Sequence, residues 1–340
     1  MTASGPYRGL SPFAEADAPY FFGRDHDRRV IVANLIASPL TLLYAPSGVG
    51  KTSVLLAGVN PAVRRLQRDD GTPEYVPVVV RNWSGDALGA IYEALAHSTG
   101  HRFGANGTHL AERLAATATE LNATLLLVLD QFEEFMLYHG DAVAPGEVAW
   151  ELTRLMTDRD VPARIMLGMR EDSLAMLDRF KGRVPRLFAN YLRLEHLDFD
   201  AARAAITCPL EAWNARHPDD LWAADDDLVD AVIADVASGH VDLGRTGGGT
   251  TANGTPGQVE TAFLQLVMTR LWEEERSHGS QRLQASTLRK LGGASTLVRT
   301  HVDRRMRTLT RRQRDLAAEA FHQLVTPSGT KVAQSARNDS

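Results

Sequence analysis

The sequence predicts an α/β fold, in which a five-stranded parallel sheet carries helices on both faces and a helical region follows. Short apolar segments alternate with stretches of helical period through the first part of the chain. This alternation is typical of a parallel sheet that is buried on both faces. After about residue 198 the apolar strands stop and only helical periods continue. The first predicted strand is joined to the helix after it by a glycine-rich turn.

The predicted strands are short and rich in branched apolar residues. They span residues 40–45, 74–80, 124–130, 163–169 and 191–197. Helices are expected from about residue 51 and over residues 86–98, 109–121, 146–158 and 171–189. Three more helical periods cover residues 201–213, 226–238 and 259–275. We therefore predict a core of residues 1–197, a helical domain of residues 198–303 with a mobile Gly/Thr-rich loop at 244–257, and a C-terminal segment of residues 304–340.

Composition excludes several classes of protein. The chain has 340 residues with 37 Lys and Arg against 42 Asp and Glu, a net charge of −5, which argues against a surface built wholly for nucleic acid or membrane. The single cysteine, Cys208, excludes an intrachain disulfide and a multi-thiolate metal site. No apolar run approaches the roughly 18 residues that span a bilayer, and the N-terminal residues do not resemble a secretory signal. We expect a cytoplasmic protein without a membrane partner.

Residues 45–52 read Ala-Pro-Ser-Gly-Val-Gly-Lys-Thr and match the phosphate-loop pattern G-x-x-x-x-G-K-[ST] except at Ala45. The segment follows an apolar strand and opens a helix, which is the context that phosphate binding requires. Two glycines let backbone N–H groups converge on phosphates, while Lys51 would reach the β- and γ-phosphates and Thr52 would bind Mg²⁺. The expected nucleotide-binding residues are Pro46, Ser47, Gly48, Val49, Gly50, Lys51, Thr52 and Ser53.

The strand that ends in Leu-Leu-Leu-Val-Leu-Asp predicts a second, acidic element of the same site. Asp130 should lie at the carboxyl edge of the sheet and hold Mg²⁺ opposite Thr52. The next position, where many related ATPases carry a carboxylate as general base, is Gln131, and an amide cannot accept a proton. Glu133 and Glu134 follow, and either could approach the attacking water. Alternatively, both charge the first turn of a following helix.

One predicted strand, 74–80, separates the phosphate-loop strand from the Asp130 strand in sequence. This spacing fits the additional-strand class of P-loop ATPases, in which strand 163–169 would lie between those two. Arg170 would then arrive at the carboxyl edge facing the γ-phosphate, which a guanidinium can sense through paired hydrogen bonds. The alternative is a surface arginine paired with Glu171 or Asp172. Because no guanine-reading motif is present, we expect ATP rather than GTP.

With these residues placed, the chain resembles the STAND class of AAA+-like signalling ATPases, and more closely its novel STAND NTPase domain. The resemblance covers nearly the whole chain. The segments that carry it are PYRGLSPFAEADAPYFFGRD (6–25), APSGVGKTS (45–53), LLVLDQFEEF (126–135), GMREDSL (168–174), ARAAITCPLEAW (202–213), FLQLVMTRLWEE (263–274) and LGGASTLVRTHVD (291–303).

The resemblance implies further roles. Gly23 and Arg24 would lie at the adenine and ribose end of the site, and Pro209 would meet the adenine from a helical lid. The alternative for Pro209 is an ordinary proline at the first position of a helix. Residues from about 304 would begin a winged-helix-like segment. With ATP or ADP and Mg²⁺ as cofactors, the implied function is a slowly hydrolysing switch whose lid responds to the nucleotide, and which assembles with its own copies or with a sensor or effector protein.

Two other functions compete with the switch. Gln131 also fits a nucleotide-binding interaction module that does not hydrolyse. A DNA-binding regulator is suggested by an arginine-rich run, although a solvated or internally paired helix face is the expected reading of such a run. The run consists of Arg299, Arg304, Arg305, Arg307, Arg311, Arg312 and Arg314. The histidines show no paired ligand spacing, so we predict no zinc site.

Overall fold

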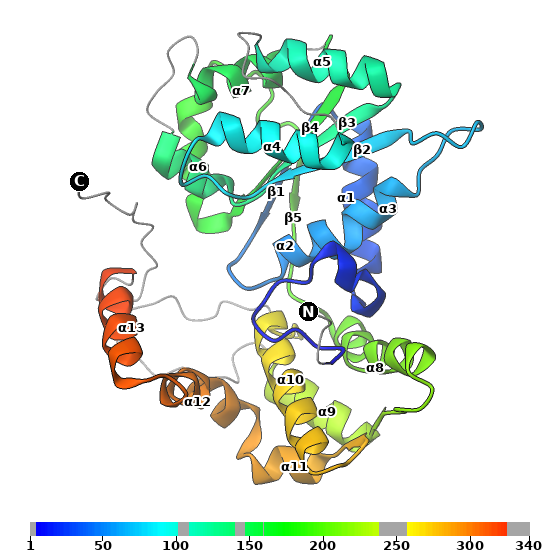
Figure 1. Cartoon of the computed structure of the whole chain (residues 1–340), viewed down its shortest axis with the longest axis vertical. Coiled ribbons are helices and arrows are strands. Elements are labelled where there is room, and N and C mark those ends of the chain that lie inside the picture. Colours follow the sequence, from blue (N-terminus) through cyan, green and yellow to red (C-terminus); the bar gives the residue numbers. More distant parts are fainter. Residues whose placement is uncertain (1–4, 101–108, 140–146, 159, 238–256, 325–340) are drawn as a thin grey trace. The chain divides into compact units, whose positions relative to one another are not determined.

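The computed structural model describes residues 5–100, 109–139, 147–158, 160–237 and 257–324 (Figure 1). The chain divides into two compact units, which we name by their content. The sheet unit comprises residues 25–47 and 51–195, and the helical unit comprises residues 1–24, 48–50 and 196–340. Three residues of the phosphate loop therefore group with the helical unit. No helix in the described part of the chain is long and apolar enough to cross a membrane.

The sheet unit is built on five parallel strands in the order β2-β3-β4-β1-β5. The strands are β1 (Leu40–Ala45), β2 (Tyr75–Val80), β3 (Thr124–Leu129), β4 (Ala163–Arg170) and β5 (Tyr191–Arg193). The predicted parallel sheet is confirmed, and so is the predicted place of strand 163–169 between the phosphate-loop strand and the Asp130 strand. Strand β5 is shorter than the predicted 191–197.

The register of the sheet brings the ends of its central strands to one edge. Ala45 of β1 pairs with Arg170 of β4, and Leu129 of β3 pairs with Val80 of β2. Strand β3 is the centre of the core, because all five of its residues from Leu125 to Leu129 are fully buried. Complete burial of one such aliphatic side chain contributes about 1.5–3 kcal/mol. The apolar runs thus fix the strands, and the residues just after them share one edge.

Helices flank the sheet (Figure 1). They are α1 (Asp25–Ala37), α2 (Lys51–Ser53), α3 (Asn60–Arg64), α4 (Ala87–Thr99), α5 (Leu110–Leu121), α6 (Phe132–His139) and α7 (Val148–Thr157). Between α2 and α3 the chain forms a π-helical segment, η2 (Val54–Val59). The helix predicted over 171–189 is wrong in part. A 3₁₀ segment, η3 (Glu171–Phe180), ends before Gly182, which has a positive φ, and Pro185, which cannot donate to a helix.

The helical unit contains η1 (Glu15–Tyr20), α8 (Phe199–Arg216), α9 (Asp226–Asp235), α10 (Thr261–Ser277), α11 (Ala285–Lys290), α12 (Gly293–Arg307) and α13 (Arg311–Leu324). The expectation that strands stop after residue 198 is wrong in detail, since β6 (Ala223–Ala224) and β7 (Arg282–Leu283) form a short parallel pair. The predicted loop 244–257 lies outside the described residues except for Gly257. Of segment 304–340, the structure describes residues 304–324, which lie in the end of α12 and in α13. The winged-helix character of this segment stays a prediction.

Residues 5–24 pack within the helical unit. The Tyr7 hydroxyl donates to the Ile206 carbonyl of α8 at 2.7 Å. At Gly5, a Cβ would lie 2.4 Å from Trp272 Nε1, so the indole of α10 leaves room only for glycine. The compact units thus differ from the predicted core of 1–197 at this end. Whether the predicted domains fold independently is not tested by these units, so the domain boundaries stay a prediction.

Candidate functional site

The phosphate loop takes the backbone course that its glycines permit. Gly48 has φ +82° and Gly50 has φ +99°, both in the left-handed region that favours glycine. Helix α2 begins at Lys51, directly after the loop, so its first N–H groups have no partner in the preceding turn. The loop therefore presents backbone donors and a helix start in the arrangement that binds phosphate.

The structure brings the phosphate loop and the acidic strand end together. Lys51 Nζ pairs with Asp130 Oδ1, and the Thr52 hydroxyl donates to Asp130 Oδ2 at 2.6 Å. The Asp130 side chain is only 1% exposed, so this carboxylate is almost fully enclosed by its partners. Neighbouring β4 makes room at Gly168, where a Cβ would lie 3.0 Å from Asp130 Oδ1. A side chain at position 168 would press on this pair.

A buried tryptophan fixes the backbone of Asp130. Trp83 Nε1 donates to the Asp130 carbonyl at 2.8 Å, and the indole is fully buried. Its ring lies edge-on to Phe132 and Phe135, which are stacked on each other in α6. A hydrogen bond of this kind adds about 0.5–1.5 kcal/mol. Trp83 belongs to no motif in the sequence, although its place three residues after strand β2 is a usable signal.

The two glutamates after Asp130 have different surroundings. Both lie in the first turn of α6, so the helix in the alternative reading does exist. Glu133 is buried, accepts from the Arg170 backbone N–H at 3.2 Å, and has its pKa raised, mainly by burial. Glu134 instead accepts from the Gln131 side-chain amide at 3.2 Å. Gln131 itself has φ +55°, so the strand turns sharply where the base was expected.

Arg170 stands at the end of β4, and its guanidinium is paired within the chain. Nε donates to Asp172 Oδ1 at 3.1 Å, and Nη2 also pairs with that carboxylate. The ion pair predicted as the alternative for Arg170 is thus present, with Asp172 as partner. Glu171 pairs with Arg193 instead. Contact of Arg170 with a phosphate stays a prediction, and the phosphate would compete with Asp172 for the guanidinium.

The residues implied by the resemblance lie in the helical unit. Gly23 has φ +81°, and a Cβ there would lie 2.3 Å from the Ala201 carbonyl oxygen, so close approach to α8 requires glycine. Arg24 is buried and donates to the carbonyl of Val49 at 2.8 Å and to Thr261 Oγ1 at 3.3 Å. It therefore contacts the phosphate-loop backbone of its own unit. An adenine or ribose role for either residue stays a prediction.

Pro209 is buried in the interior of α8, ten residues after the first helical residue. The alternative of a proline at the first helical position is therefore wrong. A proline in a helix interior removes one backbone hydrogen bond and is unfavourable unless its surroundings compensate. The position is thus unusual for a purely structural residue, and contact with adenine stays a prediction.

The oxygen atoms of Thr52 and Asp130 suit Mg²⁺, which prefers oxygen ligands and commonly takes one or two carboxylates together with phosphates. No group of three or more His, Cys, Asp or Glu side chains in the described ranges is placed to hold a metal ion. A site for Mg²⁺ here would therefore take its remaining ligands from the nucleotide and from water.

The parallel sheet, the phosphate loop and the acid at the end of β3 define a P-loop NTPase. Residues 6–340 match the family novel STAND NTPase 1, and the chain belongs to that family. A search among curated proteins gives no match.

Three solved structures are similar to this chain at low sequence identity. The Aeropyrum pernix ORC2 protein in its ADP form is 18% identical, with 82% of this chain and 68% of that chain covered and a TM-score of 0.50. The same protein in ADPNP–ADP complexes is 17% identical at a TM-score of 0.49, over 78% of this chain and 65% of that one, just under two thirds of its length. The Walker-type ATPase PABY2304 of Pyrococcus abyssi is 15% identical, with 96% and 89% covered and a TM-score of 0.49.

Proposed function

We propose that this NTPase is an ATP-binding, slowly hydrolysing signalling switch. The observation that carries the proposal is the convergence of Lys51 and Thr52 with Asp130 at one edge of the sheet. In this arrangement Lys51 would turn from Asp130 to the β- and γ-phosphates. Thr52 and Asp130 would hold Mg²⁺, which offsets phosphate charge and orients the terminal phosphate when bound.

Slow hydrolysis follows from the side chains after Asp130. Gln131 cannot accept a proton from the attacking water. Glu133 is the better candidate of the two glutamates, because burial raises the pKa of its carboxyl and thereby its basicity. Its bond from the Arg170 backbone places it beside the end of β4. Glu134 accepts a hydrogen bond from the Gln131 amide and is therefore the weaker candidate for the general base.

The switch itself requires contacts that differ between ADP and ATP, because a ligand shifts an equilibrium only by its differential affinity. The γ-phosphate supplies that difference, and Arg170 is the residue we assign to it. Pro209 and the helices around it would follow the nucleotide as a lid. Assembly with further copies of the chain, or with a sensor or effector protein, would then depend on the lid.

The experiment that tests the switch compares two variants with opposite expected effects. Arg170→Ala should leave ADP affinity nearly unchanged and remove the difference between ADP and a non-hydrolysable ATP analogue. Asp172→Asn should widen that difference, because it frees the Arg170 guanidinium from its pair. Hydrogen exchange over residues 202–213 and 259–276 measures the lid with each nucleotide.

Identical protection of these segments by both nucleotides in the wild type, at every protein concentration, would contradict the switch. Tight nucleotide binding with no turnover would then favour the non-hydrolysing interaction module. Equal responses of Arg170→Ala and Asp172→Asn would show that the guanidinium does not report the γ-phosphate.

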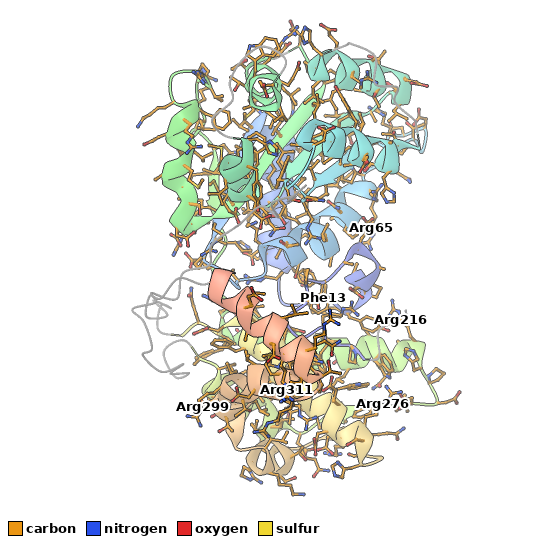
Figure 2. All side chains as sticks on the ribbon, turned by 60° about the vertical axis from the view of Figure 1, so that its left-hand side comes forward. Phe13, Arg65, Arg216, Arg276, Arg299 and Arg311 are labelled. Atoms are coloured by element: carbon orange, nitrogen blue, oxygen red, sulfur yellow. The ribbon has the colours of Figure 1, made fainter. Side chains whose placement is uncertain are left out.

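Nucleic-acid binding is a second candidate function, supported by the arginine-rich run on α12 and α13. Six of its seven arginines are exposed, and Arg304 is half-buried. Arg299 lies on α12 and Arg311 begins α13 (Figure 2). Among the described residues none of the seven forms a salt bridge, although Glu273 and Glu274 of α10 attract Arg304 electrostatically. Exposed cations without partners suit a phosphate backbone.

Replacing Arg311, Arg312 and Arg314 with glutamine should weaken duplex DNA binding, because each phosphate contact releases counterions. Three lost contacts should reduce the slope of log K against log salt by about 3. Fluorescence anisotropy over a salt series measures the slope. As a control, Arg65→Gln changes an exposed arginine at the end of α3 (Figure 2). Equal slopes for the triple variant and this control would leave the run as a solvated helix face.

A further inference from the structure

Arg81 follows the last residue of β2 and so lies at the same sheet edge as Asp130. Val80 and Leu129 are register partners, and the Asp130 backbone N–H donates to the Val80 carbonyl at 2.9 Å. The two side chains therefore leave adjacent parallel strands at equivalent positions. Arg81 was not singled out by the sequence, because it belongs to no motif and stands 30 residues after Lys51.

The Arg81 guanidinium is held near an acid without bonding to it. Nε lies 3.9 Å from Asp130 Oδ2, beyond hydrogen-bond range, and is buried with no hydrogen-bond partner. Asp130 already uses one oxygen for Lys51 and the other for Thr52. Yet the Arg81 side chain as a whole keeps 38% of its surface exposed, so a ligand can reach it. A buried charged donor without an acceptor is unfavourable, and an anion at this place would satisfy it.

We infer that Arg81 binds the terminal phosphate of a nucleoside triphosphate. This inference rests on the proposed function, since it takes a nucleotide in the phosphate loop as given. The β- and γ-phosphates and Mg²⁺ of P-loop NTPases lie between the loop lysine, the loop hydroxyl and the strand acid. Those three groups are Lys51, Thr52 and Asp130, and Arg81 Nε approaches the same Asp130 oxygen that Thr52 contacts.

Arg81 is better prepared for this contact than Arg170. Arg170 already directs Nε and Nη2 to Asp172, so a phosphate would compete with that carboxylate for the guanidinium. Arg81 has no protein hydrogen bond to break in the described part of the chain. The strand order places β2 and β4 on opposite sides of β3, so the two arginines start from opposite sides of Asp130. The triphosphate would thus recruit Arg81 without breaking a hydrogen bond, and only the longer contact of Nε with Asp130 at 3.9 Å would change.

The test measures affinity by calorimetry for ADP and for a non-hydrolysable ATP analogue, each with Mg²⁺. Arg81→Gln keeps a polar, hydrogen-bonding side chain, although a shorter one, and removes its charge, and Arg81→Lys keeps the charge without the planar fork. Arg81→Gln should weaken analogue binding by about 10- to 100-fold, the range for a hydrogen bond to a charged group, and leave ADP binding within about twofold. Arg81→Lys should show a smaller, equally selective loss.

Arg65→Gln serves as the matched control and should change neither affinity. Thermal unfolding without nucleotide checks folding, and Arg81→Lys carries the comparison if Arg81→Gln does not fold. Equal losses for ADP and the analogue would overturn the inference, because Arg81 would then merely position Asp130, which serves both nucleotides. Unchanged affinity for both would overturn it as well. If wild-type protein binds neither nucleotide, the proposed function fails and the inference fails with it.

Discussion

Lys51→Ala should abolish nucleotide binding. The Lys51 ammonium is the charge that the phosphate loop offers to the β- and γ-phosphates, and no other lysine lies in the loop. Its present partner is the almost fully enclosed Asp130 carboxylate. Calorimetry with ATP and ADP measures the loss, and retained micromolar affinity for either nucleotide would contradict the phosphate-loop assignment.

The same substitution should also lower stability, and a second variant separates the two effects. Removing one partner of a buried ion pair costs about 3–5 kcal/mol, because the remaining charge stays enclosed. At position 130 the Thr52 hydroxyl remains, which moderates that cost. The double variant Lys51→Ala with Asp130→Asn removes the stranded charge. It should recover most of the unfolding temperature and none of the nucleotide affinity. Recovery of affinity together with stability would show that Lys51 acts only through folding.

The sheet could be predicted because each of its strands is an apolar run. Strand β3 consists of aliphatic residues apart from its first position, and full burial requires that composition. Its separation from β1 in the sheet could be predicted because strand 74–80 lies between the two in sequence, and because the phosphate loop follows β1 and Asp130 follows β3. The pair of β6 with β7 could not, because strands of two residues carry no period. The early end of η3 depends on Gly182 and Pro185. These two residues disfavour a helix, but the helical period of the surrounding residues predicted one through residue 189.

The site was predictable only where its residues belong to motifs. Lys51, Thr52 and Asp130 follow known patterns at the ends of predicted strands, and the structure brings them together. Trp83, which follows β2, and Gly168 of β4 lie against the same aspartate, and no motif identifies them. Contacts of this kind depend on distances between distant segments, which periodicity along the chain does not contain.

The N-terminal segment illustrates the same limit. Its sequence contains turn residues and the Gly23-Arg24 pair, but it does not indicate which part of the chain the segment packs against. In the structure the Tyr7 hydroxyl donates to the Ile206 carbonyl of α8, and the Arg24 guanidinium donates to the Val49 carbonyl of the phosphate loop. Long-range hydrogen bonds of buried polar groups assign the segment to the helical unit, because such groups need partners wherever the chain can provide them.

Glu133→Gln should reduce ATP turnover by about 100- to 10,000-fold, the usual contribution of a general base, while nucleotide affinity stays nearly unchanged. Wild-type turnover should itself stay below about 10 per second, the median for enzymes, since Gln131 supplies no base. Burial raises the pKa of Glu133, so the acid limb of the wild-type pH profile should lie above the ordinary glutamate value. Steady-state phosphate release over a pH series measures both turnover rates and the acid limb, and calorimetry measures the nucleotide affinity.

The folding stability of Glu133→Gln should rise, in contrast to its turnover. Because the folded-state pKa of Glu133 is raised above its unfolded value, the contribution of this group is fully present below the unfolded pKa and is lost as pH rises through the folded pKa. At neutral pH the ionised carboxylate therefore destabilises the fold, and the amide of Glu133→Gln avoids this while it can still accept from the Arg170 N–H. The variant should unfold at a higher temperature than wild type at neutral pH, with the difference vanishing in acid.

Glu134→Gln is the matched control, since its side chain lies in the same helical turn and accepts from Gln131 instead. It should retain most turnover and show no comparable gain in stability. Greater loss of turnover in Glu134→Gln than in Glu133→Gln would move the base to residue 134. A parallel fall of turnover and unfolding temperature in Glu133→Gln would show that the carboxylate supports the end of β4 rather than the reaction. Loss of activity with gain of stability is the combination that a buried base, kept for function against its own desolvation, must produce.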